Sequence, residues 1–318
     1  MLKNSYATYG GILIGGLYGL LMRILFGVGL KGFDFADLFS ITFVWVVPIL
    51  VGLTPLIFSS RERLDSIIYR ISIPAFSVLT FFIFCLITRF EDIICLMVIA
   101  LPFLVVAGIA GAILGGVILR QRKKNGILYS IFLLPFLTGI IEPNFPTPTQ
   151  NFETTSSIII SAENSEIWKR IVRVGEIRET EYRKGLFNYA GIPRPLYAEL
   201  DKDKLGGIRI GHFEGGLRFR ENIIKWEKDH SVTFDIKIIP SATNRTIFER
   251  HMLNGQHFKF LNATYQLRKI NKVQTELSLK TEYQLDTKIN FYGEFWGQLL
   301  LSDFQDRLLC VIRNRCEK

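Results

Sequence analysis

The sequence predicts an α+β protein in two parts, a helical membrane region over residues 1–142 and a compact domain over residues 154–318. Three observations predict this division. The first part contains long apolar runs whose charges are gathered between the runs. The second part mixes both signs of charge and alternates apolar with polar residues, as strands do. A proline-rich connection at residues 143–153, predicted to be extended, joins the two parts.

Five apolar runs are candidate membrane spans. Four of them, at about 9–30, 38–58, 71–87 and 93–119, are long enough to cross about 30 Å of hydrocarbon as helices. The fifth, at about 127–141, is short, and we expect a short span, a re-entrant segment or an interfacial helix. The region therefore has four or five spans. An ion-coupled transporter is poorly supported, because no run carries an acidic residue in its middle.

Basic residues indicate the orientation of these spans. They follow the second and the fourth run, as Arg61, Arg63 and Arg70, and then Arg120, Arg122, Lys123 and Lys124. Such residues concentrate on the cytoplasmic side. If the amino terminus is also inside and the fifth run crosses, the C-terminal domain emerges on the outer face, and otherwise it stays in the cytoplasm. We expect the outer, periplasmic face of a bacterial inner membrane.

Small residues recur at the four-residue spacing of helix contacts in the first and fourth runs. The sets are Gly11, Gly15 and Gly19, then Gly108, Ala112 and Gly116, and Ala107, Gly111 and Gly115. Two interpretations are open, packing within one helical bundle or a contact that forms a homo-oligomer. Arg23, inside the first run, is either a functional intramembrane cation or a side chain that reaches the interface.

Charge and ligand spacing exclude several functions. The net charge of +9 is shared about equally by the two parts, and the second part has no block of Lys and Arg, so we expect no nucleic-acid partner. The four cysteines and four histidines show no zinc-binding spacing. The sequence therefore predicts neither a metal nor a cofactor.

The second part begins with a strand and ends with a helix. A β-rich run at 155–161 precedes an amphipathic helix at 162–174, and five alternating segments follow at 207–213, 217–226, 231–239, 257–268 and 272–285. From about 292 to 315 the chain forms a long helix with apolar residues every fourth position. The loop at 191–195, GIPRP, is predicted as a cavity lid, as an apolar tip whose Arg194 meets lipid phosphate, or as a plain packed loop.

Four segments carry a resemblance to a known superfamily. They are SIIISAENSEIWKRI at 157–171, GHFEGGLRFRENIIKW at 211–226, NKVQTELSLKTEYQL at 271–285 and FWGQLLLSDFQDRLLCVIRNRCEK at 295–318. In their order, one strand, helices, five antiparallel strands and a terminal helix, residues 154–318 resemble START-like domains. These are also called SRPBCC or polyketide cyclase/dehydrase and lipid-transport domains, and they have the Bet v 1 helix-grip fold. The resemblance leaves out the apolar runs.

The resemblance implies a cavity that binds a lipid, polyketide, sterol or other apolar molecule. A sheet that curves around a long helix leaves space between them, which apolar residues line. The candidate lining residues are the inward positions of the strands and the helix: Phe219, Phe234, Ile236, Phe260, Tyr265, Tyr283, Trp296, Leu300 and Phe304. The alternative is that these residues fill an ordinary core.

The predicted function is reversible binding of a hydrophobic small molecule or lipid next to the bilayer. An alternative is a membrane-bound enzyme of the cyclase or dehydratase type, with His212 and Glu221 as an acid–base pair on neighbouring strands. Glu221 shares a strand face with Phe219, so it acts only if that face is concave. The resemblance transfers no catalytic residue. A third possibility is a protein-interaction module whose cavity is filled.

Overall fold

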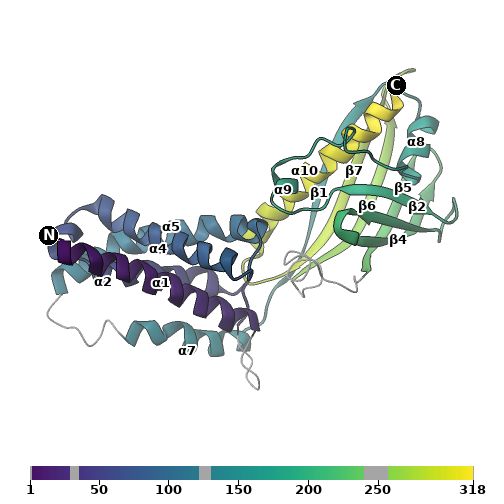
Figure 1. Cartoon of the computed structure of the whole chain (residues 1–318). Helices are drawn as coiled ribbons and strands as arrows, with labels where there is room; N and C mark the ends of the chain where they lie inside the picture. The colour runs from purple at the N-terminus through teal and green to yellow at the C-terminus, as the bar shows by residue number, and fades with distance from the viewer. Residues whose placement is uncertain (1, 29–35, 122–129, 240–256, 318) are drawn as a thin grey trace. The chain divides into compact units, whose positions relative to one another are not determined.

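The chain folds into two compact units, Met1–Thr147 and Pro148–Lys318. The computed structural model describes residues 2–28, 36–121, 130–239 and 257–317 (Figure 1). The first unit is helical. The second combines an antiparallel sheet with helices, so the α+β class predicted from the sequence is confirmed.

The helices of the first unit follow the predicted apolar runs. They are α1 (Leu2–Val28), the π-helical η1 (Thr42–Val46), α2 (Val47–Ile57), α3 (Arg61–Leu64), α4 (Ile67–Ile87), α5 (Ile93–Gln121), η2 (Ile131–Leu133), α7 (Leu134–Ile141) and η3 (Glu142–Asn144). Among the described residues, three helices are long and apolar enough to cross a membrane: Tyr6–Gly27, Ile67–Ile87 and Ile93–Arg120. The second and fifth runs form shorter apolar helices, Thr42–Ile57 and Ile131–Asn144.

The second run is shorter than predicted because polar groups fix where its helix begins. The Ser40 hydroxyl accepts a hydrogen bond from the backbone N–H of Phe43 at 3.1 Å. The carboxylate of Glu142 accepts two more, from the N–H groups of Ile41 and Thr42 at 2.7 and 2.9 Å. These acceptors satisfy donors that a helix start leaves free. The residues before Ser40 therefore lie outside the helix.

Glycines of α1 allow close contacts within the first unit. A side-chain carbon at Gly15 would collide with Ser77 of α4 and with the carbonyl oxygen of Val51 of α2. At Gly11 the same carbon would lie 2.8 Å from the Cα atom of Pro55. Packing within one bundle, the first of the two interpretations of these small residues, therefore accounts for this face of α1.

Arg23 lies buried between helices and has a carboxylate partner. Its side chain is 4% exposed and forms an ion pair with Glu91, which precedes α5. A second hydrogen bond, of 3.0 Å, reaches the carbonyl oxygen of Phe90. Arg23 is therefore tied to the segment that joins α4 to α5. This pair was not predicted, because Glu91 lies outside every apolar run.

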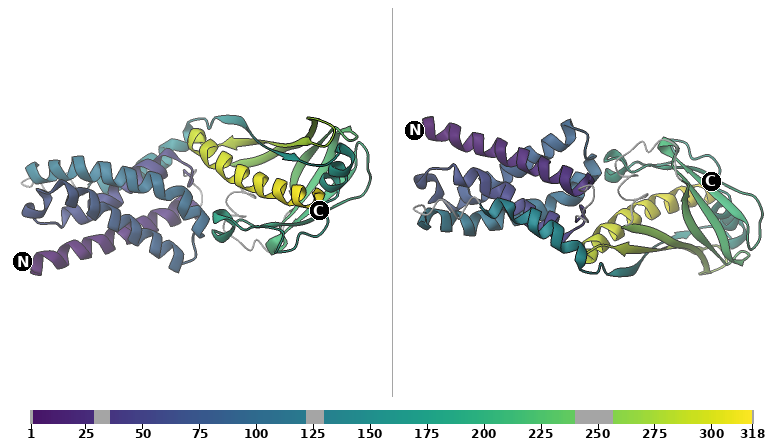
Figure 2. Two further views of the ribbon diagram at one scale, coloured as in Figure 1. Left: turned by 90° about the horizontal axis from the view of Figure 1, so that it is seen from above. Right: turned by 90° about the horizontal axis from the view of Figure 1, so that it is seen from below.

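The second unit is a seven-stranded antiparallel sheet with the order β1-β7-β6-β5-β4-β3-β2. The strands are β1 (Thr149–Ile160), β2 (Pro195–Leu200), β3 (Ile208–Phe213), β4 (Arg218–Glu227), β5 (Ser231–Ile239), β6 (Phe258–Lys269) and β7 (Thr275–Asp286). The helices are α8 (Asn164–Val172), α9 (Leu186–Tyr189) and α10 (Asn290–Cys316), with the short η4 (Glu214–Gly216). The sheet curves around α10, which packs along β1 and β7 (Figure 2).

Two strands differ from the prediction. No strand was predicted at β2, whose first residue belongs to the loop predicted at 191–195. β2 pairs with β3 at the edge of the sheet, where Pro195 is tolerated. β1 begins at Thr149, six residues before the predicted strand, because its partner β7 extends to Asp286 opposite it. The remaining strands and α10 lie where the alternation and the helical period placed them.

Candidate functional site

The concave face of the sheet is the face that α10 covers. Buried and half-buried residues alternate strictly along β7, and the buried set includes Tyr283. Because directly paired residues share a face, the strand registers extend this face across the sheet. Tyr283 pairs with Phe260 on β6, and Phe219 on β4 pairs with Ile238 on β5 and with Gly211 on β3.

One end of the concave face is a closed core. Its buried residues come from α8, the strands and the C-terminal half of α10, and include Ile167, Trp168, Ile171, Phe234, Tyr265, Leu267, Leu277, Leu279, Leu308, Leu309 and Ile312. Nearly all these side chains are almost completely covered. This end holds the unit together and offers no surface to a ligand.

The other end of the concave face is aromatic and only partly covered. We call it the aromatic end, and it comprises Phe213, Phe219, Ile236, Phe260 and Phe304. The ring of Phe219 lies 5.0 Å from that of Phe213 and 5.5 Å from that of Phe260, centroid to centroid. Phe213 also lies 6.0 Å from Phe304 of α10. All except Phe219 are half-buried, so the sheet and helix leave apolar surface accessible here.

The structure separates the nine predicted lining residues into groups. Phe219, Ile236, Phe260 and Phe304 belong to the aromatic end, and the half-buried Trp296 and Leu300 lie on the same helix as Phe304. The other three are in tightly covered places. Phe234 and Tyr265 belong to the closed core, and the fully buried Tyr283 lies beneath Gly297 of α10. Sequence reasoning missed Phe213, although it is on the same strand face as Gly211.

A buried ion pair lies between the closed core and the aromatic end. Arg209 of β3 donates from Nε to the carboxylate of Glu221 on β4 and from Nη1 to the carbonyl oxygen of Ile171, the latter at 2.6 Å. Its guanidinium carbon lies 3.8 Å from the ring centroid of Phe234. The ring of Tyr265 is 5.7 Å away. Two neighbouring strands and α8 thus hold one charged cluster inside the sheet.

The environment of this cluster sets its protonation. Burial is the largest influence on the pKa of Arg209 and alone would lower it, but the interactions with Glu221 and Tyr265 together outweigh burial, and the net direction is upward. Burial raises the pKa of Tyr265, partly offset by the charge of Arg209. At neutral pH the cluster therefore consists of a guanidinium ion and a neutral phenol beside Glu221.

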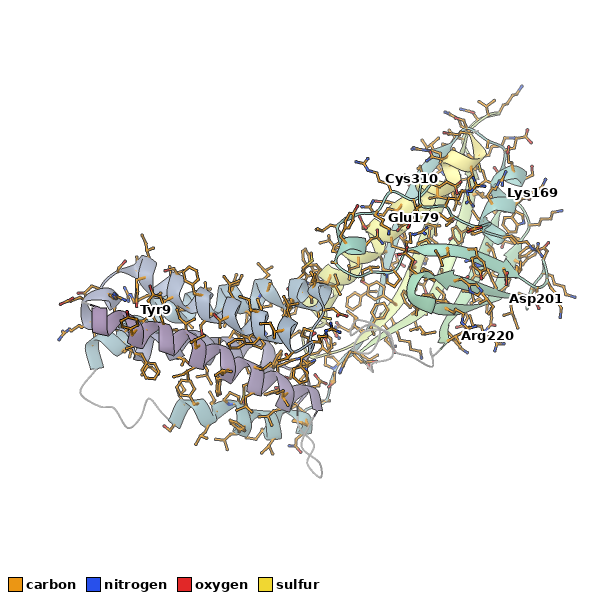
Figure 3. All side chains as sticks on the ribbon, in the orientation of Figure 1. Tyr9, Lys169, Glu179, Asp201, Arg220 and Cys310 are labelled. Carbon is orange, nitrogen blue, oxygen red and sulfur yellow. The ribbon has the colours of Figure 1, made fainter. Side chains whose placement is uncertain are left out.

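His212 and Glu221 do not come together. Glu221 pairs with Arg209 on the concave face. His212 pairs instead with Arg218 on β4 and with Tyr197 on β2. The His212 ring stacks on Tyr197 at 4.2 Å on the outer face. This is the face on which Arg220 points away from the sheet (Figure 3). The two candidate catalytic residues thus stand on opposite faces.

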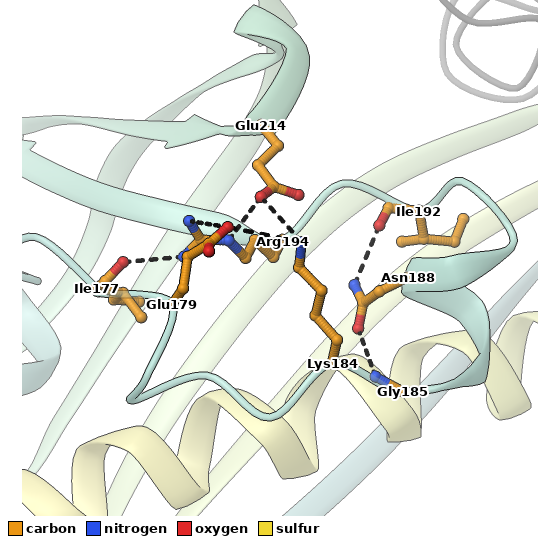
Figure 4. A network of polar contacts seen from close by, with 8 residues as sticks. All are labelled: Ile177, Glu179, Lys184, Gly185, Asn188, Ile192, Arg194 and Glu214. Carbon is orange, nitrogen blue, oxygen red and sulfur yellow. Dashed lines mark hydrogen bonds and ion pairs between the residues drawn. The ribbon is translucent and has the colours of Figure 1, made fainter.

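The loop at 191–195 is fixed by ion pairs. Arg194 is buried, and it donates to the Glu214 carboxylate at 2.6 Å and to the carbonyl oxygen of Ile177 at 2.9 Å (Figure 4). The Asn188 side chain makes two 3.0 Å hydrogen bonds to the backbone at the two ends of α9. Arg194 therefore makes its polar contacts within the protein, and the prediction that it meets lipid phosphate is wrong.

Exposed apolar side chains lie next to the aromatic end. They are Leu186 and Tyr189 of α9 and, at four-residue intervals along α10, Phe291, Phe295 and Leu299. We call this set the apolar rim. The two helices meet through Phe187 and Trp296, whose ring centroids are 6.5 Å apart. Tyr189 is 75% exposed and Phe291 66% exposed, which is unusual for residues of this size.

Among the residues that the structure describes, neither a cluster of metal ligands nor the surface pocket near the end of α10 coincides with the aromatic end. Among the described residues, no three His, Cys, Asp or Glu side chains gather as metal ligands would. An open surface pocket of about 430 Å³ is lined by Thr180, Glu181, Val311, Asn314 and Glu317. It lies by the last turns of α10, at the far end of the helix from the rim, and its lining is mostly polar. It does not match the expected apolar site.

Comparison with known proteins finds likeness in the second unit alone. No family model and no curated protein matches the chain. Norcoclaurine synthase from Thalictrum flavum is 13% identical over 54% of this chain and 89% of its own, with a TM-score of 0.35. The protein XoxI from Bacillus cereus is 12% identical over 52% of this chain and 94% of its own, with a TM-score of 0.33. Likeness at this level says nothing about what the chain binds.

Proposed function

We propose that the C-terminal unit, whose curved sheet and long helix have the helix-grip architecture of START-like domains, binds an apolar small molecule or lipid beside a bilayer. The aromatic end is the observation that carries this proposal. A core built only for stability covers its large rings, as the closed core does. Phe213, Phe260 and Phe304 instead keep accessible surface on the concave face. Ligand sites are lined mostly by apolar and aromatic surface of this kind.

The mechanism is reversible capture. An acyl chain or ring system that leaves water for the aromatic end gains about 25 cal/mol for each Å² of apolar surface buried. The closed core next to the aromatic end is rigid, because its side chains are close-packed and cannot move to admit a ligand. The bound molecule leaves by the same route when a membrane or another acceptor offers equal burial.

The apolar rim supports a location next to a membrane. Its side chains lie on α9 and on the first turns of α10, at the end of the sheet where β1 begins. Seven residues separate the end of α7 from the start of β1. The first unit carries three helices able to cross a bilayer, so a lipid surface is within reach of the second unit. Exposed aromatic residues favour the interfacial layer of a bilayer.

The proposal includes an orientation. Arg61 and Arg63 lie in α3, which packs on α5, and Arg120 lies in the last turn of α5. Arg61, Arg63 and Arg120 thus gather at one end of the first unit, while Arg89 lies alone in the connection between α4 and α5, and we assign the end with more basic residues to the cytoplasm. Arg122, Lys123 and Lys124 lie outside the described residues. With a crossing fifth segment, the C-terminal unit is periplasmic in a bacterial inner membrane.

Solvent extraction of the purified chain tests the proposal. The full chain is incubated with a membrane extract, purified, and its bound small molecules are quantified by mass spectrometry. We expect about one apolar molecule for each chain, lost in Phe260→Glu because a carboxylate in the aromatic end repels apolar surface. Ile236→Phe, which stays apolar but fills space, lowers the yield as well.

Ile159→Glu provides the matched control, because Ile159 is an exposed residue of β1. It introduces the same charge and leaves the concave face unchanged, so its yield equals that of the unmodified chain. Equal yields in all the variants would contradict the proposal. That result would favour a filled core and a role in protein interaction.

A further inference from the structure

The buried pair of Arg209 and Glu221 leaves one polar atom open to the aromatic end. Oε2 of Glu221 accepts from Arg209, whereas Oε1 has no hydrogen-bond partner among the residues that the structure describes. The Glu221 side chain is 12% exposed, so this oxygen is neither fully solvated nor sealed in the core. A carboxylate oxygen in such a place is short of a hydrogen-bond donor.

The absence of a side chain at Gly211 keeps this oxygen accessible. Gly211 stands beside Glu221 on the concave face, directly opposite Phe219. A side-chain carbon at Gly211 would lie 3.4 Å from Glu221 Oε1 and 3.4 Å from the edge of the Phe213 ring. A larger side chain would occupy the space between the carboxylate and the rings. The space over Gly211 thus has an acceptor on one side and aromatic surface on the other.

Arg209 does not offer its charge to a ligand. Its Nε and Nη1 donate to Glu221 and to the carbonyl oxygen of Ile171, and one face of the guanidinium lies against Phe234. An anionic head would therefore meet the open acceptor of Glu221 and not a free cation. A molecule with a hydroxyl or an amine would supply the donor that the oxygen lacks.

We infer that the ligand of the aromatic end is an apolar molecule bearing a hydrogen-bond donor, a hydroxyl or an amine, which it gives to Glu221 Oε1. The inference rests on the proposed function and adds the class of ligand. It excludes free fatty acids in their ionised form. Phe213 and Phe219 contact the apolar body next to the donor, and Gly211 admits the donor to the carboxylate.

Two probes that differ only in the donor test this inference. The full chain in phosphatidylcholine nanodiscs is titrated with 4-butylphenol and with 4-butylanisole, in which a methyl group replaces the hydroxyl proton, and empty nanodiscs give the blank. We expect the phenol to bind at least about tenfold more tightly than the anisole, because a hydrogen bond to a charged acceptor changes affinity by about this factor.

Three variants test which residues cause the preference for the phenol over the anisole. In Glu221→Gln the amide presents a donor, so the ratio of the two affinities falls to about one or reverses. Gly211→Val keeps the ion pair and blocks the space over it, so it removes the preference even if the glutamine variant fails to fold. Glu199→Gln removes an exposed carboxylate of β2 and leaves the ratio unchanged.

The outcomes separate the two proposals. Binding of both probes with equal affinity to the unmodified chain would overturn the inference about the donor and leave the apolar site standing. A preference that survives in both Glu221→Gln and Gly211→Val would overturn it too. Failure of both probes to bind would overturn the proposed function and this inference with it.

Discussion

The ion pair of Arg209 and Glu221 is the residue-scale feature that most constrains the site. Both side chains are almost fully covered, and Arg209 is tied to α8 as well as to β4. Arg209→Met leaves a carboxylate in an apolar place, so we expect the free energy of unfolding to fall by about 3–5 kcal/mol. Urea unfolding followed by tryptophan fluorescence measures this loss.

A double variant tests whether the loss comes from the unpaired charge. Arg209→Met combined with Glu221→Leu removes both charges, and we expect it to cost less than the sum of the two single changes. Arg268→Met is the control, because Arg268 forms an exposed ion pair with Glu276 and should cost at most about 1 kcal/mol. Additive losses at 209 and 221 would show that the charges do not interact.

Close contact of Gly297 with Tyr283 gives a second prediction at this scale. A side-chain carbon at Gly297 would lie 2.7 Å from the Tyr283 hydroxyl oxygen and 2.9 Å from the ring. Gly297→Ala must push α10 or a fully buried ring aside, so we expect a loss of about 1–3 kcal/mol of stability. Gly175→Ala, where the nearest side-chain atom is 3.9 Å away, should be nearly neutral. Thermal unfolding of both variants checks this, and equal midpoints would refute the contact.

At the scale of elements, α8 and α10 together control the reactivity of a cysteine. Burial raises the pKa of Cys316 to about 11, and Glu166 of α8 adds to the shift. Since the thiolate is the reactive form, we expect alkylation at pH 8 to be slow and to rise about tenfold for each pH unit up to that value. Peptide mapping after iodoacetamide treatment measures the rate. In urea the thiol regains its ordinary pKa and reacts quickly. Equal alkylation rates of Cys316 in the folded and the unfolded chain at pH 8 would contradict the packing of α8 on α10.

The elements differed in how well the sequence predicted them. α10 and strands β3 to β7 were predicted because their apolar residues repeat with the period of a helix or a strand. β2 was missed because edge strands need no apolar alternation and can start with proline.

The candidate site was predictable only in part. Alternation showed that Phe219 and Glu221 share a face, but the partner of Glu221 depends on the register between β3 and β4. A shift by one residue would have brought Ile208 or Ile210 opposite Glu221 and excluded Arg209. Apolar residues for the core and for the aromatic end have the same spacing, so sequence did not separate Phe234 from Phe260.

At the scale of the whole molecule, ligand binding beside a bilayer requires the apolar rim to meet lipid. A nitroxide attached at Phe291→Cys in the full chain, after the other cysteines are changed to serine, reports its surroundings in proteoliposomes. We expect high accessibility to oxygen and low accessibility to a polar nickel chelate, because an exposed aromatic helix favours the interface. Val273→Cys is the control, since Val273 is equally exposed but lies in the β6–β7 turn at the other end of the sheet.

The rim prediction has a clear contrary result. If position 291 is as accessible to the nickel chelate as position 273, the rim is in water. The C-terminal unit then collects its ligand from solution or from a partner protein, and the short connection to the apolar helices serves another purpose.

Photo-crosslinking from position 260 shows directly whether a small molecule occupies the aromatic end. Benzoylphenylalanine replaces Phe260 in the full chain, and native membranes that contain this variant are irradiated. The mass of the crosslinked peptide is then measured by mass spectrometry. We expect a discrete adduct of an apolar small molecule on the peptide that contains position 260. Crosslinks that join this peptide only to other segments of the chain, such as those around Phe219 and Phe304, would show that the aromatic end is a filled core and would contradict ligand binding there.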